Sequence, residues 1–495
     1  MFESGETVYL FRHAMLREGA YGLHLPSVRS ALHASVVDIL ESILSPGELE
    51  GIAGELADHC RAGASANPDC HARELHWLGV HGDRARRAGR PEEALQAFSR
   101  IARHEHAEGG TRLKAKFDLA EVLAHIGRET QAMEDFGEIV PEAARNGDER
   151  LHAEALTHWA PLALARGQVD ESRDALEQAL QLNRRLQRRE AEADVLSRLS
   201  MLARHVGDPA LAEKLITQAI EVQRESNDSA ARAQTLITLA DVLLPQQRYA
   251  EVEGALEEAE AIAEQTGKRY LMMHIHTTHA AMAGGRGDWA GSEQSIRKAI
   301  EISRETGARS DTAGLLDQLG GSLRMQGNFA EAEPYHRQAM ELLEEIGDEM
   351  RLGVVAMNYA GLCKRMGRME EAGELYERAL RHVDRSRDVR LRGHGRGNYA
   401  EYLHKQGRLE ESREMFSQSL ELLAQSGDVV VRAIQQGRFA ALLMRMGRRD
   451  EAASAFTESL SVLQGAGNDF GIGVTRQAMG EVCEELGLET PPEPA

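Results

Sequence analysis

Glycines recur along this sequence at intervals of 40 residues, and this spacing constrains the fold more than any other feature. The glycines on the 40-residue grid are Gly127, Gly167, Gly207, Gly287, Gly327, Gly367, Gly407, Gly447 and Gly487. The one gap, at position 247, holds Gln247. A fixed period of about 20–50 residues indicates a repeat architecture. We therefore expect a row of similar units, each packed on its neighbours, in place of one central core.

Residue types at fixed distances from each grid glycine show what one unit contains. Small residues stand seven places before the glycine, among them Ala160, Ala240, Ala360, Ala400 and Ala440. Small residues beside a turn let two helices pack closely. Glycine suits the left-handed position that ends a helix. A second turn at the half-period carries residues that favour a helix start, namely Asp148, Asp228, Asp348, Asp388, Asp428 and Asn468. The pattern predicts an all-α fold, a right-handed α-solenoid of about ten helix-turn-helix repeats.

Composition and charge exclude several classes of protein. Aromatic residues make up only 4% of the chain, which disfavours β-sandwiches and barrels. The net charge of −21 disfavours nucleic acid as a partner, because an acidic surface repels phosphate. The sequence contains no run of 18 apolar residues, so it predicts no membrane-spanning helix. The four cysteines include no CxxC pair, so we expect no disulfide framework and a reducing, cytoplasmic location.

The segment from Gly367 to Leu380 has the pattern G-R-x-x-E-A-x-x-x-[FY]-x-x-A-[LM]. This pattern resembles the tetratricopeptide repeat, and the 40-residue period resembles its long-repeat members, such as kinesin light chain, Pins-type adaptors and MalT-like regulators. The resemblance covers roughly residues 72–487. It implies a non-catalytic protein-interaction scaffold without a cofactor.

The first residues do not fit the repeat. The string Val8-Tyr9-Leu10-Phe11-Arg12-His13-Ala14 and its continuation resemble the segment that follows the ATPase module in bacterial signalling ATPases. The phosphate-binding string GxxxxGK[ST] of such a module does not occur. We expect a helical remnant at residues 1–50, a junction with a first irregular repeat at 51–110, regular repeats at 111–487 and a flexible tail at 488–495. The chain is then a stand-alone derivative or the C-terminal fragment of a larger signalling ATPase.

A polar column nine residues before each grid glycine supplies the candidate ligand-binding residues. Its members include Arg198, Thr278, Gln318, Asn358, Asn398 and Arg438. By the family resemblance, Asn358 and Asn398, each in an Asn-Tyr-Ala string, lie on the concave face and hydrogen-bond the backbone of an extended peptide. The alternative interpretation is a solvated polar stripe, as on any amphipathic helix.

Three other features of the sequence could form a metal-binding or ligand-binding site. His274, His276 and His279 offer metal-binding side chains, but two of them occupy repeat positions held elsewhere by large apolar residues, so we expect packed histidines. Cys60 and Cys70 are nine residues apart, a spacing that does not favour a metal site. We therefore predict no metal centre.

Gly393-His394-Gly395-Arg396-Gly397 lies inside an expected helix. It indicates either a soft helix or bare backbone that a ligand approaches closely.

The function that the sequence favours is a scaffold that binds a protein or peptide segment in its concave groove, in bacterial signalling or transcriptional regulation. Two alternatives stay open. The repeats could sense a small-molecule inducer, as in MalT-like regulators, or the solenoid ends could mediate self-association.

Overall fold

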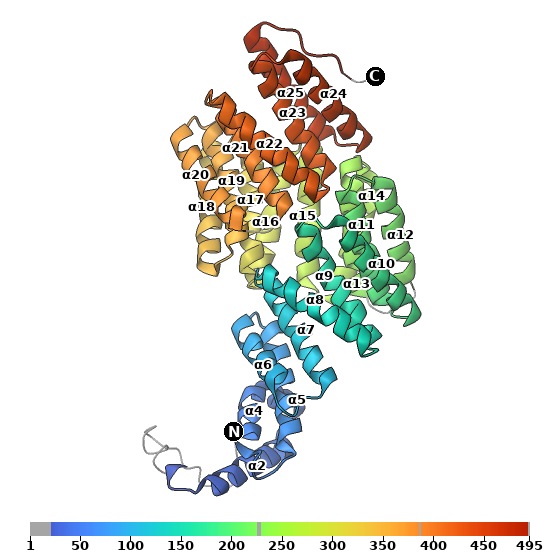
Figure 1. Cartoon of the computed structure of the whole chain (residues 1–495), viewed down its shortest axis with the longest axis vertical. Helices are drawn as coiled ribbons and strands as arrows, with labels where there is room; N and C mark the ends of the chain where they lie inside the picture. The colour runs from blue at the N-terminus through green and yellow to red at the C-terminus, as the bar shows by residue number, and fades with distance from the viewer. Residues whose placement is uncertain (1–20, 225–228, 386–387, 494–495) are drawn as a thin grey trace. The chain divides into compact units, whose positions relative to one another are not determined.

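The computed structural model describes residues 21–224, 229–385 and 388–493, and all its regular elements in these ranges are helices (Figure 1). The chain divides into two compact units, residues 1–147 and residues 148–495. The predicted all-α solenoid is confirmed. The sequence string from Val8 to Ala14 and the expected helix-capping residue Asp228 lie outside the described residues.

The first unit contains seven described α-helices, which pair as successive hairpins. They are α2 (Pro26–Ile43), α3 (Pro46–Gly51), α4 (Ala53–Gly63), α5 (Cys70–Arg87), α6 (Pro91–Arg103), α7 (Gly109–His125) and α8 (Glu129–Arg145).

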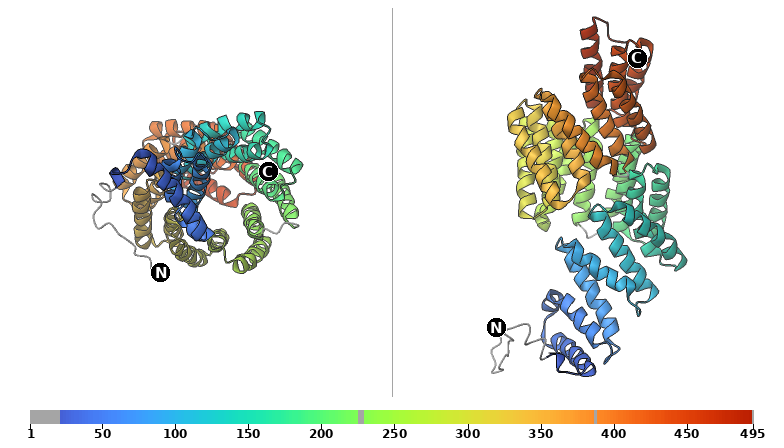
Figure 2. Two further views of the ribbon diagram at one scale, coloured as in Figure 1. Left: turned by 90° about the horizontal axis from the view of Figure 1, so that it is seen from below. Right: turned by 60° about the vertical axis from the view of Figure 1, so that its left-hand side comes forward.

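The second unit consists of helix pairs that follow one another along a curve (Figure 2). The first helices of its repeats are α9 (Glu149–Ala165), α11 (Arg189–His205), α13 (Ser229–Leu243), α15 (Arg269–Gly285), α17 (Arg309–Met325), α19 (Glu349–Arg365), α21 (Val389–Lys405), α23 (Val429–Arg445) and α25 (Asp469–Leu486). The second helices are α10 (Val169–Arg185), α12 (Pro209–Gln223), α14 (Tyr249–Thr266), α16 (Trp289–Glu305), α18 (Phe329–Ile346), α20 (Met369–Arg385), α22 (Leu409–Ser426) and α24 (Arg449–Gly465).

The two kinds of turn have the predicted geometry. Every grid glycine has a positive φ, from 64° at Gly487 to 83° at Gly327. Gln247, in the gap of the grid, adopts the same left-handed conformation with φ 56°, after the short 3₁₀ helix Leu244–Gln246. The repeat geometry thus persists where the glycine is missing.

At the half-period turn, the side chain of the capping residue accepts a hydrogen bond from the backbone N–H three residues on. This bond is present at Asp148, Asp348, Asp388, Asp428 and Asn468, which confirms these helix starts.

Small residues sit at the closest helix contacts. Ala160, Ala240, Ala360 and Ala400 are fully buried. Cys363 and Cys483 are also buried, as free thiols, as expected of core residues. From α17 to α25, first helices of successive repeats contact each other as well as their own second helices.

The glycine-rich stretch of α21 is regular helix, and neighbouring side chains occupy the space beside it. A Cβ atom at Gly393 would lie 2.7 Å from Leu423, and one at Gly397 would lie 2.4 Å from Gln435. The interpretation that a ligand approaches this bare backbone is therefore wrong. Gly393 thus lets α22 of the same repeat pack closely, and Gly397 does so for α23 of the following repeat.

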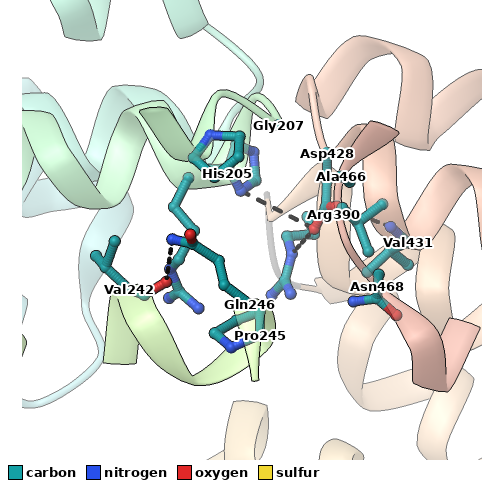
Figure 3. Close-up of a pocket in the computed structure, with 13 residues that line it drawn as sticks. His205, Gly207, Val242, Pro245, Gln246, Arg390, Asp428, Val431, Ala466 and Asn468 are labelled. Atoms are coloured by element: carbon teal, nitrogen blue, oxygen red, sulfur yellow. Dashed lines mark hydrogen bonds and ion pairs between the residues drawn. The ribbon is translucent and has the colours of Figure 1, made fainter. Parts of the chain in front are cut away.

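Within the second unit, helices more than 200 residues apart in sequence meet at a seam (Figure 3). His205 at the end of α11 donates from Nε2 to the carbonyl oxygen of Ser426 at 2.8 Å. Asp428 accepts from Arg390 and lies 3.9 Å from His205 Nδ1. Gly207 faces Val429 across the seam. The seam borders a cavity of about 180 Å³ lined on one side by Pro245 and other residues of the earlier repeats.

Candidate functional site

A pocket of about 350 Å³ opens on the first helices of four successive repeats, α19, α21, α23 and α25. We call it the α19–α25 pocket. Its polar lining residues are Lys364, Arg365, Glu401, His404, Lys405, Arg438, Gln477 and Glu481. Its apolar lining residues are Met369, Ala441, Val474, Ala478 and Val482. Residues three or four apart share a helix face, so each first helix presents more than one side chain to the pocket.

Glu401 lies at the centre of a charged network across three repeats. Its carboxylate accepts a hydrogen bond from Lys364 Nζ at 2.9 Å and lies 3.4 Å from Arg438 Nη1. Arg438 Nη1 also donates to the Asn398 side-chain oxygen at 3.0 Å. A second bond joins α21 to α25, where Lys405 Nζ donates to Glu481 Oε2 at 2.7 Å. These pairs fix the side chains that line the pocket.

The electrostatics of the pocket follow from burial and from this network. Burial raises the pKa of Glu401, but the positive charges of Arg438 and Lys364 outweigh it and hold the pKa at about 2. Burial, together with the nearby charges of Arg445 and Lys405, lowers the pKa of His404 to about 4. At neutral pH, Glu401 is therefore ionised and His404 is uncharged.

The α19–α25 pocket is consequently positive. Four cationic side chains and two carboxylates line it, which leaves two positive charges uncompensated. The chain as a whole carries a net charge of −21. A positive hollow on an acidic protein attracts an anionic group and repels further cations. This contrast makes the pocket the strongest candidate site in the described residues.

The structure brings two of the predicted polar-column residues to this pocket. Arg438 lines it, and Asn398 lies at its edge through the bond to Arg438. Asn358, one repeat earlier, is exposed on α19 and donates to Asp317 Oδ2 at 2.7 Å. Asp317 in turn accepts from the buried His336. Both asparagines thus already make contacts within the chain.

The other predicted residues lie elsewhere. Gln318 is exposed on α17. Arg198 on α11 pairs with Asp194 of its own helix at 2.9 Å. Thr278 on α15 is buried and donates to the His274 carbonyl oxygen at 3.2 Å. The six residues of the column are therefore not gathered into one site.

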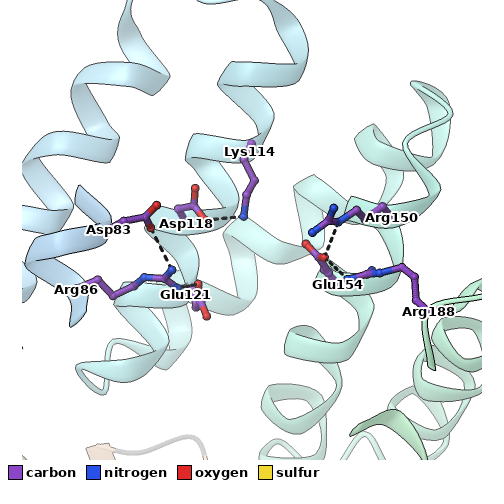
Figure 4. Close-up of polar contacts among 8 residues, drawn as sticks. All are labelled: Asp83, Arg86, Lys114, Asp118, Glu121, Arg150, Glu154 and Arg188. Atoms are coloured by element: carbon purple, nitrogen blue, oxygen red, sulfur yellow. Dashed lines mark hydrogen bonds and ion pairs between the residues drawn. The ribbon is translucent and has the colours of Figure 1, made fainter. Parts of the chain in front are cut away.

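Sequence reasoning missed the charged positions three and six residues before the grid glycine. Lys364 and Glu401 occupy these positions in successive repeats and are 37 residues apart. Arg86 and Glu121 form the corresponding pair in the first unit (Figure 4). In the second unit, Arg204 and Asp241 of the next repeat occupy the same two positions. Burial raises the pKa of Asp241, and the positive charge of Arg204 lowers it. A search for opposite charges about 37 residues apart could have found this set.

Figure 4 also shows other pairs of acidic and basic side chains in each unit. On α7, Lys114 donates to Asp118 at 2.7 Å. In the second unit, Glu154 accepts from Arg188 at 2.7 Å and from Arg150 at 3.2 Å. The Glu154–Arg188 pair joins successive repeats, whereas the other two pairs join residues four apart on one helix.

The three histidines weighed as metal ligands do not converge. His274 is exposed, while His276 and His279 are half-buried on α15. Burial lowers the pKa of His276. Among the described residues, these histidines belong to no cluster with metal-binding geometry.

Comparison with known families identifies the repeats. Models of the tetratricopeptide repeat match residues 80–148, 151–225, 190–265, 271–345 and 352–425, which together make up well over half of the chain. The chain belongs to the tetratricopeptide repeat family. A model of anaphase-promoting complex subunit 5 also matches residues 404–473. No curated protein matches the chain.

Several solved structures are similar to this chain at low identity. A Rap protein in complex with Competence and Sporulation Factor is 15% identical, with 72% of this chain and 98% of the Rap chain covered and a TM-score of 0.47. A signal transduction ATPase with a tetratricopeptide repeat sensor from Pyrococcus horikoshii is 14% identical, with coverages of 98% and 67% and a TM-score of 0.44. BtubC from P. vanneervenii is 18% identical, with coverages of 46% and 93% and a TM-score of 0.38.

The tetratricopeptide repeat is a protein-interaction fold that is typically not catalytic. Its stacked units present extended surfaces for binding partners. Among the described residues, no helix is both long enough and apolar enough to cross a lipid bilayer.

Proposed function

We propose that this tetratricopeptide repeat protein is an interaction scaffold whose α19–α25 pocket binds an acidic segment of a partner protein. The observation that carries the proposal is the positive charge of this pocket on a strongly acidic chain. Opposite charge steers a partner to its site and selects against unsuitable ones. The resemblance of the N-terminal string to bacterial signalling ATPases supports a role in bacterial signalling or transcriptional regulation.

The partner's carboxylates would meet Arg365, which is exposed, and Lys405, which is also exposed and would exchange its bond to Glu481 for the partner. Lys364 and Arg438 are less available because Glu401 engages both. Asn358 and Asn398 would bind the backbone of the same segment, with Asn398 next to Arg438. The acidic side chains would thus supply selectivity, and the amides would hold the extended backbone.

The Arg365→Glu/Lys405→Glu variant tests this proposal. Reversing both charges should abolish capture of the partner from a lysate of the source organism, measured by pull-down and mass spectrometry. Arg381→Glu is the matched control, because it reverses an exposed charge on the second helix α20. Asn358→Ala/Asn398→Ala should weaken capture less. Equal capture by wild type, control and double charge-reversal variant would contradict the proposal.

One observation favours a second candidate function, the sensing of a small anionic molecule. The pocket volume of about 350 Å³ lies within the range of about 300–1,000 Å³ typical of small-molecule sites. A ligand that binds only the folded state raises the melting temperature. If this candidate is right, small anions should stabilise the wild type and Arg381→Glu but not Arg365→Glu/Lys405→Glu.

A further inference from the structure

Two histidines and one glutamate of the first unit converge around a common point. His71 and Glu74 are three residues apart on α5 and so share a face of that helix. His104 is the C-terminal capping residue of α6, which packs against α5. One potential ligand atom from each of the three residues lies within 4.8 Å of the others.

The geometry is close to what a bound ion needs. Donor atoms at about 2.1 Å from a tetrahedral zinc ion lie about 3.4 Å from one another. His104 Nε2 and Glu74 Oε2 are already 3.3 Å apart. The ligand atom of His71 lies within 4.8 Å of both, so a side-chain movement of His71 would complete the set.

One buried polar atom of this cluster is not accounted for by the packing of the protein. His71 Nδ1 is buried and has no hydrogen-bond partner among the residues that the structure describes, whereas buried polar atoms in proteins almost always have one. Glu74 is 3% exposed, and its Oε1 accepts from Arg100 while its Oε2 faces His104. The ring of His106 stacks on that of His71 with 3.8 Å between centroids, which brings a third imidazole to the cluster.

The site has an open side. Glu74, Arg100 and His104 line a hollow of about 630 Å³, together with Arg61 and Arg103. Zinc sites with three protein ligands keep a fourth position for water or another ligand. Here that position would face the hollow.

We propose that His71, Glu74 and His104 bind a zinc ion and leave its fourth position to water. Imidazole nitrogen and carboxylate oxygen suit zinc. The nearby thiols of Cys60 and Cys70 take no part. This site is independent of the α19–α25 pocket.

The full chain, stripped of metal by a chelator, should bind one equivalent of zinc in isothermal titration calorimetry. His71→Ala and His104→Ala should each weaken binding about tenfold or more. His76→Ala is the matched control, because it removes an exposed histidine from the same helix and should leave binding unchanged. No binding, or equal affinity in His71→Ala and His76→Ala, would overturn the proposal.

Cobalt substitution keeps the proposal testable if the histidine variants fail to fold. Cobalt in the wild-type protein should give the absorption of a four- or five-coordinate site without a thiolate-to-cobalt charge-transfer band. A thiolate band would show that the cysteines bind the metal and would contradict the proposed ligand set.

Discussion

Gly207→Ala should open the seam of the second unit, whereas Gly327→Ala should not. Both glycines have left-handed backbones, with φ 81° and 83°, so alanine costs roughly 1 kcal/mol at either position. At Gly207 the added Cβ would lie 2.3 Å from Val429 across the seam. At Gly327, apart from its two chain neighbours, the described residues place no atom within 4 Å of the added Cβ. Overpacking at Gly207 should therefore cost about 1–3 kcal/mol more.

Small-angle X-ray scattering and urea unfolding measure this difference. Gly207→Ala should increase the radius of gyration and lower the unfolding midpoint, while Gly327→Ala should lower the midpoint slightly and keep the wild-type dimensions. Equal effects of the two variants would mean that the seam between α11 and α23 does not close in solution.

Glu401→Gln should destabilise the protein at neutral pH, and this effect should disappear in acid. The pKa of Glu401 falls from an ordinary 4.5 to about 2 in the folded protein. A carboxylate with a lowered pKa stabilises the fold above its unfolded pKa, and this contribution is lost as the pH falls toward the folded pKa. A shift of this size corresponds to about 3 kcal/mol.

The free energy of unfolding should therefore differ by about 3 kcal/mol between wild type and Glu401→Gln at pH 6, and the difference should shrink steadily below pH 4.5. Glu410→Gln, on the exposed side of α22, is the control and should show no such gap. A gap that stays constant with pH would show that Glu401 titrates in the ordinary range.

The features that sequence reasoning predicted are those that depend on neighbouring residues. A grid glycine needs only its own turn, and a capping residue such as Asp348 needs only the N–H three residues on. The burial of Cys363 follows from its place in the repeat. These positions could be predicted because every repeat meets the same local requirement.

The seam could not be predicted in this way. His205 meets Ser426 because small rotations add up over several repeats, and no single repeat specifies that sum. The cluster of His71, Glu74 and His104 depends on how α5 packs against α6 and on the turn after α6. His104 is 30 residues from Glu74, whereas the usual metal-binding spacings join ligands a few residues apart. These spacings therefore did not predict the cluster.

The candidate pocket could be predicted from the sequence only in part. The polar column nine residues before the glycine led to Arg438 and Asn398, which are at the pocket, but also to Arg198 and Thr278, which are not. The pair of Lys364 and Glu401 could have been predicted from the sequence, because opposite charges recur in it at a spacing of 37 residues. The net positive charge of the pocket emerges only once four helices are placed together.

The most direct test of the central claim is hydrogen exchange of the protein with and without the captured partner. Binding in the α19–α25 pocket should slow amide exchange in the C-terminal halves of α19 and α21, around Arg365 and Lys405, and leave the second helices α20 and α22 unchanged. Protection confined to the second helices, or to the first unit, would contradict the account.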